Sequence, residues 1–150
     1  MSRYFIFSFL LFVFPVFASE DPACLTMAAK EFGVDQSVFS AMYRAEEKGV
    51  SIVRNYNWFG PMKLAEPAII VASKHIQASS SQIKTDPCQN FRAAAWWLMG
   101  PSGGATDKDI WNAVDKYYYG NNSRVAPSRR FFLLSVKNIY SMNSTSVQFD

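Results

Sequence analysis

The sequence predicts an all-α domain. Helix punctuation recurs along the chain: Gly33 and Gly49 stand where a glycine ends a helix, and Asp35 and Asp86 stand where an acidic side chain caps a helix start. The stretch between positions 50 and 64 has a different pattern of β-branched and turn residues, which predicts only a small extended or loop excursion. With 49% hydrophobic and 18% charged residues among 150, the composition excludes a disordered tail.

Each expected helix lies between a start signal and a stop signal. Pro67 and Pro87 suit the first turn of two helices, because proline lacks the N–H that a helix start leaves unbonded. Thr106 or Asp107 is the expected cap of the fifth helix. The expected helices cover residues 22–32, 36–48, 67–78, 87–99, 107–119 and 128–141. Three serines at 79–81 are expected to break the third helix, and the last nine residues are expected to fray.

The N-terminal residues 1–18 (MSRYFIFSFLLFVFPVFA) predict a signal peptide that is removed after Ala18. Arg3 supplies the positive start, an apolar run follows, and the segment ends in residues that a signal peptidase reads. An uncleaved membrane anchor is the alternative, but a spanning helix needs roughly 20 apolar residues and this run is shorter and contains Pro15. Residues 19–150 are then one exported domain, without stable membrane insertion after cleavage.

The two cysteines, Cys24 and Cys88, fit an exported protein. An even number in an oxidising compartment predicts a disulfide bridge, and two free buried thiols are the alternative. The bridge would close a loop of about 65 residues, and chain entropy makes that worth roughly 4 kcal/mol. One histidine and two cysteines do not make a zinc site, so no metal or cofactor is expected. The net charge of +3 is too small to predict nucleic-acid binding.

The candidate for catalysis is a carboxyl at the end of the second helix. At about 100° per residue Glu46 falls on the apolar face of this helix, whereas Glu47 falls about 100° further round, toward solvent. A carboxyl on an apolar face is costly unless it is paired or protonated, and burial raises a carboxyl pKa toward the range a general acid needs. The alternative is an ion pair of Glu46 with Arg44, Lys48 or Arg54 at the rim of the fold.

Seven short blocks, in order and spacing, carry a resemblance to a known family. They are residues 24–29 (CLTMAA), 39–46 (FSAMYRAE), 54–57 (RNYN), 60–62 (GPM), 86–90 (DPCQN), 111–114 (WNAV) and 117–120 (YYYG). Together they resemble the lytic transglycosylases of the lysozyme-like superfamily, in particular the small exported ones that accompany secretion systems and pili. The resemblance extends from Cys24 to Tyr140, nearly the whole mature chain.

The resemblance implies a lysozyme-like fold with a reduced β or loop excursion, located in the periplasm. It implies cleavage of the β-1,4 bond between N-acetylmuramic acid and N-acetylglucosamine of peptidoglycan, with Glu46 as the single acid and base and a 1,6-anhydro product. The residues expected to contact the glycan are Asn57, Met62, Lys63, Tyr117 and Tyr118. The expected role is local opening of the cell wall for an envelope-spanning secretion or pilus machine.

The sequence also departs from the family pattern. Gln normally follows Gly-x-Met, and here Lys63 stands in its place. A Tyr-Asn pair becomes Tyr117-Tyr118, and the segment from Asn57 to Gly60 is shorter than usual. A lysine facing the site would favour the ionised carboxylate of an acid, or could bind an anionic group of the glycan. A catalytically inactive peptidoglycan-binding or assembly factor, and a secreted helical protein with no role at the wall, are therefore the alternatives.

Overall fold

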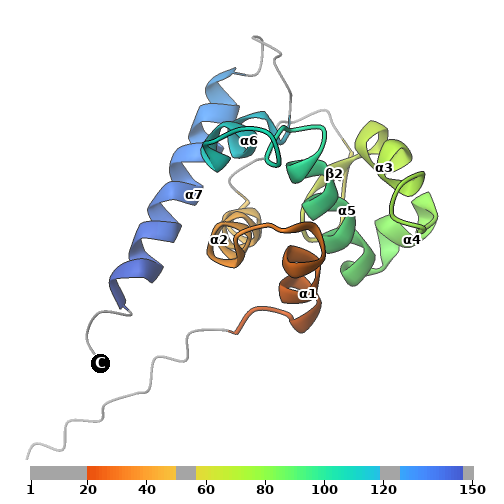
Figure 1. The fold of residues 1–150 in the computed structure, drawn as a ribbon, viewed down its shortest axis with the longest axis horizontal. Coiled ribbons are helices and arrows are strands. Elements are labelled where there is room, and N and C mark those ends of the chain that lie inside the picture. The colour runs from red at the N-terminus through yellow and green to blue at the C-terminus, as the bar shows by residue number, and fades with distance from the viewer. Residues whose placement is uncertain (1–19, 50–56, 119–125, 147–150) are drawn as a thin grey trace, which may run out of the picture.

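The computed structural model describes residues 20–49, 57–118 and 126–146, and the predicted all-α class is confirmed (Figure 1). In chain order the elements are α1 (Ala23–Phe32), α2 (Gln36–Glu47), β1 (Trp58–Phe59), β2 (Leu64–Ala65), α3 (Glu66–Ser73), α4 (Ser80–Thr85), α5 (Pro87–Met99), α6 (Ile110–Lys116) and α7 (Ala126–Ser146). The expected signal peptide, residues 1–18, lies outside the described residues. In the described part of the chain, no helix has both the length and the apolar character needed to cross a bilayer.

The first two helices begin and end close to the expected residues. Gly33 ends α1 in the left-handed conformation, with φ of 71°. Two residues later the Asp35 carboxylate accepts a hydrogen bond of 3.0 Å from the backbone N–H of Val38, which caps α2. Further along, the Asp86 carboxylate caps α5 in the same way through the N–H of Cys88, at 2.9 Å. These local capping predictions are confirmed.

The predicted extent of the third helix, residues 67–78, is wrong in its second half. Helix α3 ends at Ser73, and the chain turns before Ser79. The serines expected to act as a break instead start α4: the Ser79 hydroxyl accepts from the N–H of Gln82 at 3.1 Å, and the Gln82 amide oxygen accepts from the N–H of Ser79 at 2.8 Å. This reciprocal capping satisfies two backbone donors at once, so a new helix begins where a loop was expected.

Two later boundaries also differ from the prediction. Asp109, rather than Thr106 or Asp107, caps α6, because the two earlier residues donate their backbone N–H groups to the carbonyl of Gly103 in a turn. Helix α7 extends to Ser146, so five of the nine residues expected to fray are helical. The expected excursion is a two-stranded antiparallel hairpin with Trp58 opposite Ala65; residues 50–56 of it lie outside the described part.

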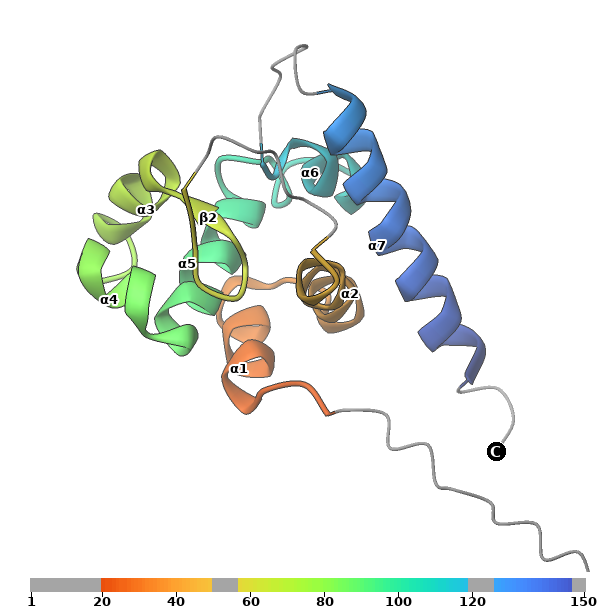
Figure 2. The ribbon, with the colours of Figure 1, turned by 180° about the vertical axis from the view of Figure 1, so that it is seen from behind.

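The helices pack around α2 and α5. Figure 1 shows α2 end-on near the centre, with α1 and α5 on one side and α7 along the other, and Figure 2 shows the same order from behind. The core contains buried side chains from α1, α2, α5 and α7, among them Leu25, Phe39, Phe91 and Phe132. The predicted disulfide is present: Cys24 of α1 and Cys88 of α5 are bonded, with their Cα atoms 5.3 Å apart.

Candidate functional site

The candidate acid, Glu46, is buried in the last turn of α2. Only 2% of the residue is exposed, whereas the side chain of Glu47 is 46% exposed and pairs with Arg44 at 3.0 Å. Arg44 also pairs with Asp21 at 3.0 Å, so it links the start of the described chain to the end of α2. The helical phase predicted from the sequence is confirmed: one glutamate of the adjacent pair points inward and the other outward.

Tyr117, at the C-terminal end of α6, is the neighbour of Glu46 in the interior. Burial first, and then the charge of the Glu46 carboxylate, raise the pKa of the Tyr117 phenol well above its usual value of 10.0. The phenol therefore stays protonated and acts as a donor, and it donates a hydrogen bond of 3.2 Å to the backbone carbonyl of Met62. The indole N–H of Trp97 donates to the Tyr117 carbonyl at 2.8 Å and holds the end of α6 in place.

The turn that carries Met62 is fixed by one buried side chain. The Asn90 amide oxygen accepts from the N–H of Met62 at 2.9 Å, and its NH₂ donates to the carbonyls of Phe59 and Ile83 at 3.0 and 3.1 Å. We call these three bonds the hairpin clamp. Gly60 lies against the clamp with φ of 71°, and a Cβ at this position would overlap the Asn90 amide. The clamp therefore joins α5 and α4 to the hairpin and requires a glycine in the turn.

Four aromatic rings pack together beside the hairpin clamp, and we call them the aromatic wall: Trp58, Tyr117, Tyr118 and Phe132. Tyr118 packs edge-to-face against three rings: Trp58 of β1 at 5.4 Å between centroids, Tyr117 at 4.8 Å and Phe132 of α7 at 4.8 Å. Residues from the hairpin, α6 and α7 thus meet at one cluster. A helix end, a hairpin turn and an aromatic wall converge near the buried carboxyl, although their residues lie far apart in the sequence.

The residues predicted to contact a glycan occupy different environments. Asn57 is exposed at the entry to the hairpin, and Tyr118 is partly buried in the aromatic wall. The Met62 side chain is fully buried in the core, so its backbone carbonyl is the part that faces Tyr117. Lys63 is half-buried and adopts a left-handed conformation with φ of 48° at the end of the turn.

Sequence reasoning missed the role of two residues in this frame. Asn90 was quoted as part of a motif, but its three buried hydrogen bonds were not predicted, because an asparagine in the first turn of a helix is ordinarily read as a capping or surface residue. Trp97 was not among the predicted site residues, and its indole N–H donates to the Tyr117 carbonyl and fixes the end of α6. Except for Ile83, which is seven positions from Asn90, the partners lie 20 or more positions away in the sequence, so no pattern within one helix could have identified them.

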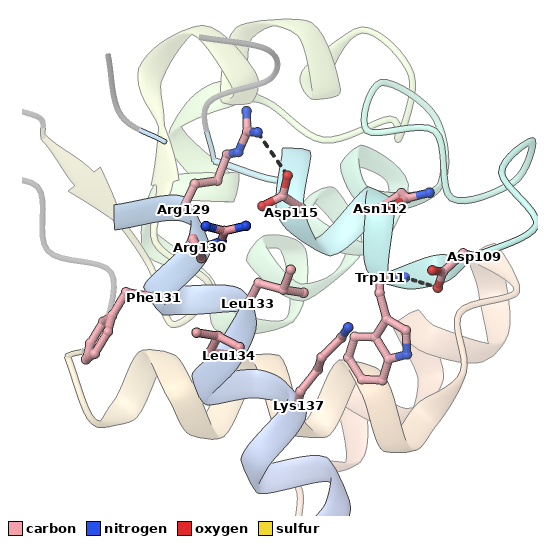
Figure 3. Close-up of a pocket in the computed structure, with 10 residues that line it drawn as sticks. All are labelled: Asp109, Trp111, Asn112, Asp115, Arg129, Arg130, Phe131, Leu133, Leu134 and Lys137. Carbon is pink, nitrogen blue, oxygen red and sulfur yellow. Dashed lines mark hydrogen bonds and ion pairs between the residues drawn. The ribbon is translucent and has the colours of Figure 1, made fainter. Parts of the chain in front are cut away.

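A hollow of 790 Å³ lies elsewhere, between α6 and α7, and none of the predicted site residues lines it (Figure 3). Within the described residues no group of three His, Cys, Asp or Glu side chains is placed to hold a metal ion. Around Glu46 the structure places a buried carboxyl beside a protonated phenol, an arrangement that suits proton transfer.

Comparison with known proteins adds no family or relative. No protein-family model matches the chain, and no curated protein sequence matches it.

Proposed function

We propose that the protein is a peptidoglycan lytic transglycosylase with a lysozyme-like fold. The proposal depends on one observation above all: a glutamate that is 2% exposed ends α2 beside a buried tyrosine, Tyr117, which is hydrogen-bonded to the hairpin turn. A carboxyl has no structural need to be buried at a helix end, and desolvating one costs free energy. Such placement is typical of catalytic acids, whose neutral form is favoured by burial.

In the proposed reaction Glu46 transfers two protons. Its neutral carboxyl first donates a proton to the glycosidic oxygen between N-acetylmuramic acid and N-acetylglucosamine, and the C1–O bond breaks. The resulting carboxylate then takes the proton of the 6-hydroxyl of the same muramic acid, and that oxygen bonds to C1. The products are a new 4-hydroxyl and a 1,6-anhydro ring, and Glu46 is neutral again. The reaction consumes no water and uses no second catalytic carboxylate, in contrast to ordinary glycosidases.

Tyr117 and the hairpin supply the surroundings that this cycle requires. The phenol remains neutral because its pKa is raised, so it adds no charge next to the carboxyl. Its bond to the Met62 carbonyl couples the end of α6 to the hairpin that the clamp holds. The carboxyl must be held in place because its oxygen atoms must reach first the glycosidic oxygen and then the 6-hydroxyl.

The setting proposed for this activity is the periplasm, after removal of residues 1–18. The Cys24–Cys88 disulfide supports it, because such bonds persist in oxidising compartments. Peptidoglycan strands are the proposed substrate, and the proposed purpose is local opening of the wall for an envelope-spanning secretion or pilus machine.

A second candidate is a factor that binds peptidoglycan without cutting it, and Lys63 is the observation that favours it. Its side chain is half-buried on the turn next to Met62, where the resemblance places a neutral glutamine. An ammonium group there would attract the anionic lactyl or peptide groups of the glycan. Binding could therefore persist even if the cation suppressed proton donation by keeping Glu46 ionised.

The test uses residues 19–150 with purified sacculi and mass spectrometry of the released muropeptides. We expect 1,6-anhydro products, and Glu46→Gln should lower their rate by about 10²- to 10⁴-fold, the range for loss of a general acid. Glu47→Gln is the matched control, because it removes an adjacent but exposed carboxylate. Full activity in Glu46→Gln would remove this residue from the site. Sacculi that bind the protein without release of products would favour the non-catalytic candidate.

A further inference from the structure

The hollow between α6 and α7 is separate from the proposed glycan site, and its lining combines apolar walls with charge. Figure 3 shows it between the two helices, with Trp111 on the α6 side and Leu133, Leu134 and Lys137 on the α7 side. Its volume of 790 Å³ is large enough to accept several side chains of another molecule. Nothing in the proposed transglycosylase reaction uses this surface.

The charges of the hollow are unbalanced. Arg129 pairs with Asp115, with 2.9 Å between the charged atoms, whereas the Asp109 carboxylate accepts the backbone N–H of Trp111 and keeps its charge. Arg130 and Lys137 both line the hollow, and neither has an ion-pair partner among the residues that the structure describes. The described lining therefore holds three cations against two carboxylates, with Lys137 also lying over the Trp111 ring, and this excess of positive charge favours an incoming molecule that carries negative charge.

Two apolar residues that line the hollow from α7 are also strongly exposed. Phe131 and Leu134 are 60% and 59% exposed, and Met142 is exposed further along. Phe131 and Met142 are separated by 11 positions, which is about three turns or about 16 Å of helix. Phe131 and Leu134, three positions apart, form an apolar pair on one face of α7, and the exposed Asn138 separates this pair from Met142.

Trp111 is in contact with two side chains of α7. The Lys137 ammonium lies 5.4 Å from the centre of the indole ring, and the ring of Tyr140 packs nearly perpendicular to it at 5.3 Å. The indole is thus already engaged by two partners from α7, which disfavours stacking of a sugar ring on it. It serves as a wall of the hollow, for which an aliphatic side chain is the better complement.

We propose that this surface docks an acidic amphipathic helix of a partner protein. Its apolar side chains would fill the hollow and cover Phe131 and Leu134, and its carboxylates would pair with Arg130 and Lys137. A second copy of this chain is a poorer occupant, because a two-fold interface would bring the same unpaired cations together. A bilayer is also poorer, since the described lining of the hollow holds only two cations without an ion-pair partner and they line a concave surface, whereas peripheral helices present a convex cationic face.

The test uses the mature protein and two fluorescent synthetic helices of about 18 residues, or five turns. Both carry leucines on one face; the first has glutamates flanking the leucines, and the second has lysines at the same positions. Fluorescence anisotropy at low salt should show that the glutamate helix binds about tenfold or more tightly than the lysine helix. Arg130→Glu combined with Lys137→Glu should reverse this preference, and Phe131→Ser combined with Leu134→Ser should weaken binding by about tenfold.

Matched controls come from α1, where Met27 is 69% exposed and Lys30 is exposed. Met27→Ser and Lys30→Glu should leave both affinities unchanged, and circular dichroism should show native helix content for every variant. Equal binding of the two peptides, or equal loss in the α1 variants, would overturn the proposal. So would a concentration-dependent dimer that Phe131→Ser dissociates, which would assign the face to a second copy. Binding to anionic vesicles but not to the glutamate helix would assign it to a membrane.

Discussion

The hairpin clamp offers the sharpest test of how this fold holds its candidate site. Replacing Asn90 by alanine removes all three of its hydrogen bonds and leaves the N–H of Met62 and the carbonyls of Phe59 and Ile83 without that partner. A buried polar group left unsatisfied costs about 1–3 kcal/mol. Water can reach part of the turn, because Phe59 is only partly buried, so we expect the variant to lose about 3–5 kcal/mol of stability.

The measurement is urea unfolding of the mature protein, followed by tryptophan fluorescence and by circular dichroism. Asn112→Ala is the control, because that asparagine is exposed on α6 and makes one long bond of 3.3 Å to Asp107; its effect should stay within about 0.5 kcal/mol. A loss below about 1 kcal/mol in Asn90→Ala would refute the reasoning, since it would mean that the turn is held by something other than the clamp.

Three further perturbations follow from the structure. Replacing Cys24 and Cys88 by serine should lower the free energy of unfolding by about 4 kcal/mol, and the reduced wild-type protein should unfold at about the same urea midpoint as this double variant. Gly60→Ala should cost at least about 1–2 kcal/mol for its left-handed backbone alone, and an unchanged midpoint would contradict the overlap with the clamp. The hydrogen bond and charge of Arg92 lower the pKa of Glu31 below its usual value of 4.5. The Arg92–Glu31 pair therefore stabilises the folded protein fully above pH 4.5, and this contribution is lost as the pH falls through the lowered pKa. The stability difference between wild type and Glu31→Gln should therefore be present at pH 7 and shrink in acid; a difference that does not change with pH would exclude the pair as its cause.

The sequence was sufficient for the cap of α2 and for the orientation of its two glutamates. The cap at Asp35 and the inward phase of Glu46 each depend on residues within one or two turns of the same helix, so a periodic pattern contains the information. The disulfide was predictable for another reason: a chain with two cysteines allows only one pairing.

The sequence was insufficient where two local preferences compete or where the partner is distant. The serines at 79–81 suit both a break and a helix start, and only the reciprocal bonds of Ser79 and Gln82 select the start. At the beginning of α6, Thr106, Asp107 and Asp109 are all acceptable caps, and the turn closed on Gly103 by the first two decides for the third. The deciding bonds join residues three or four positions apart, and the Ser-x-x-Gln pattern at 79–82 is a local helix-start signal that the prediction overlooked.

Lys63 illustrates how a departure from a family pattern can leave a structural frame intact. Its position in the turn requires a left-handed backbone, with its N–H bonded to the Gly60 carbonyl at 3.1 Å, and this requirement concerns the main chain. The bonds that place Met62 between Asn90 and Tyr117 are likewise made by the main chain of the hairpin. A different side chain at position 63 therefore alters the charge on the hairpin and leaves the support behind the buried carboxyl unchanged. If the protein acts on glycans as proposed, the lysine is expected to affect which glycans bind and how readily they are cut. Lys63→Gln should therefore change binding and cleavage, while the free energy of unfolding changes by no more than about 0.5 kcal/mol.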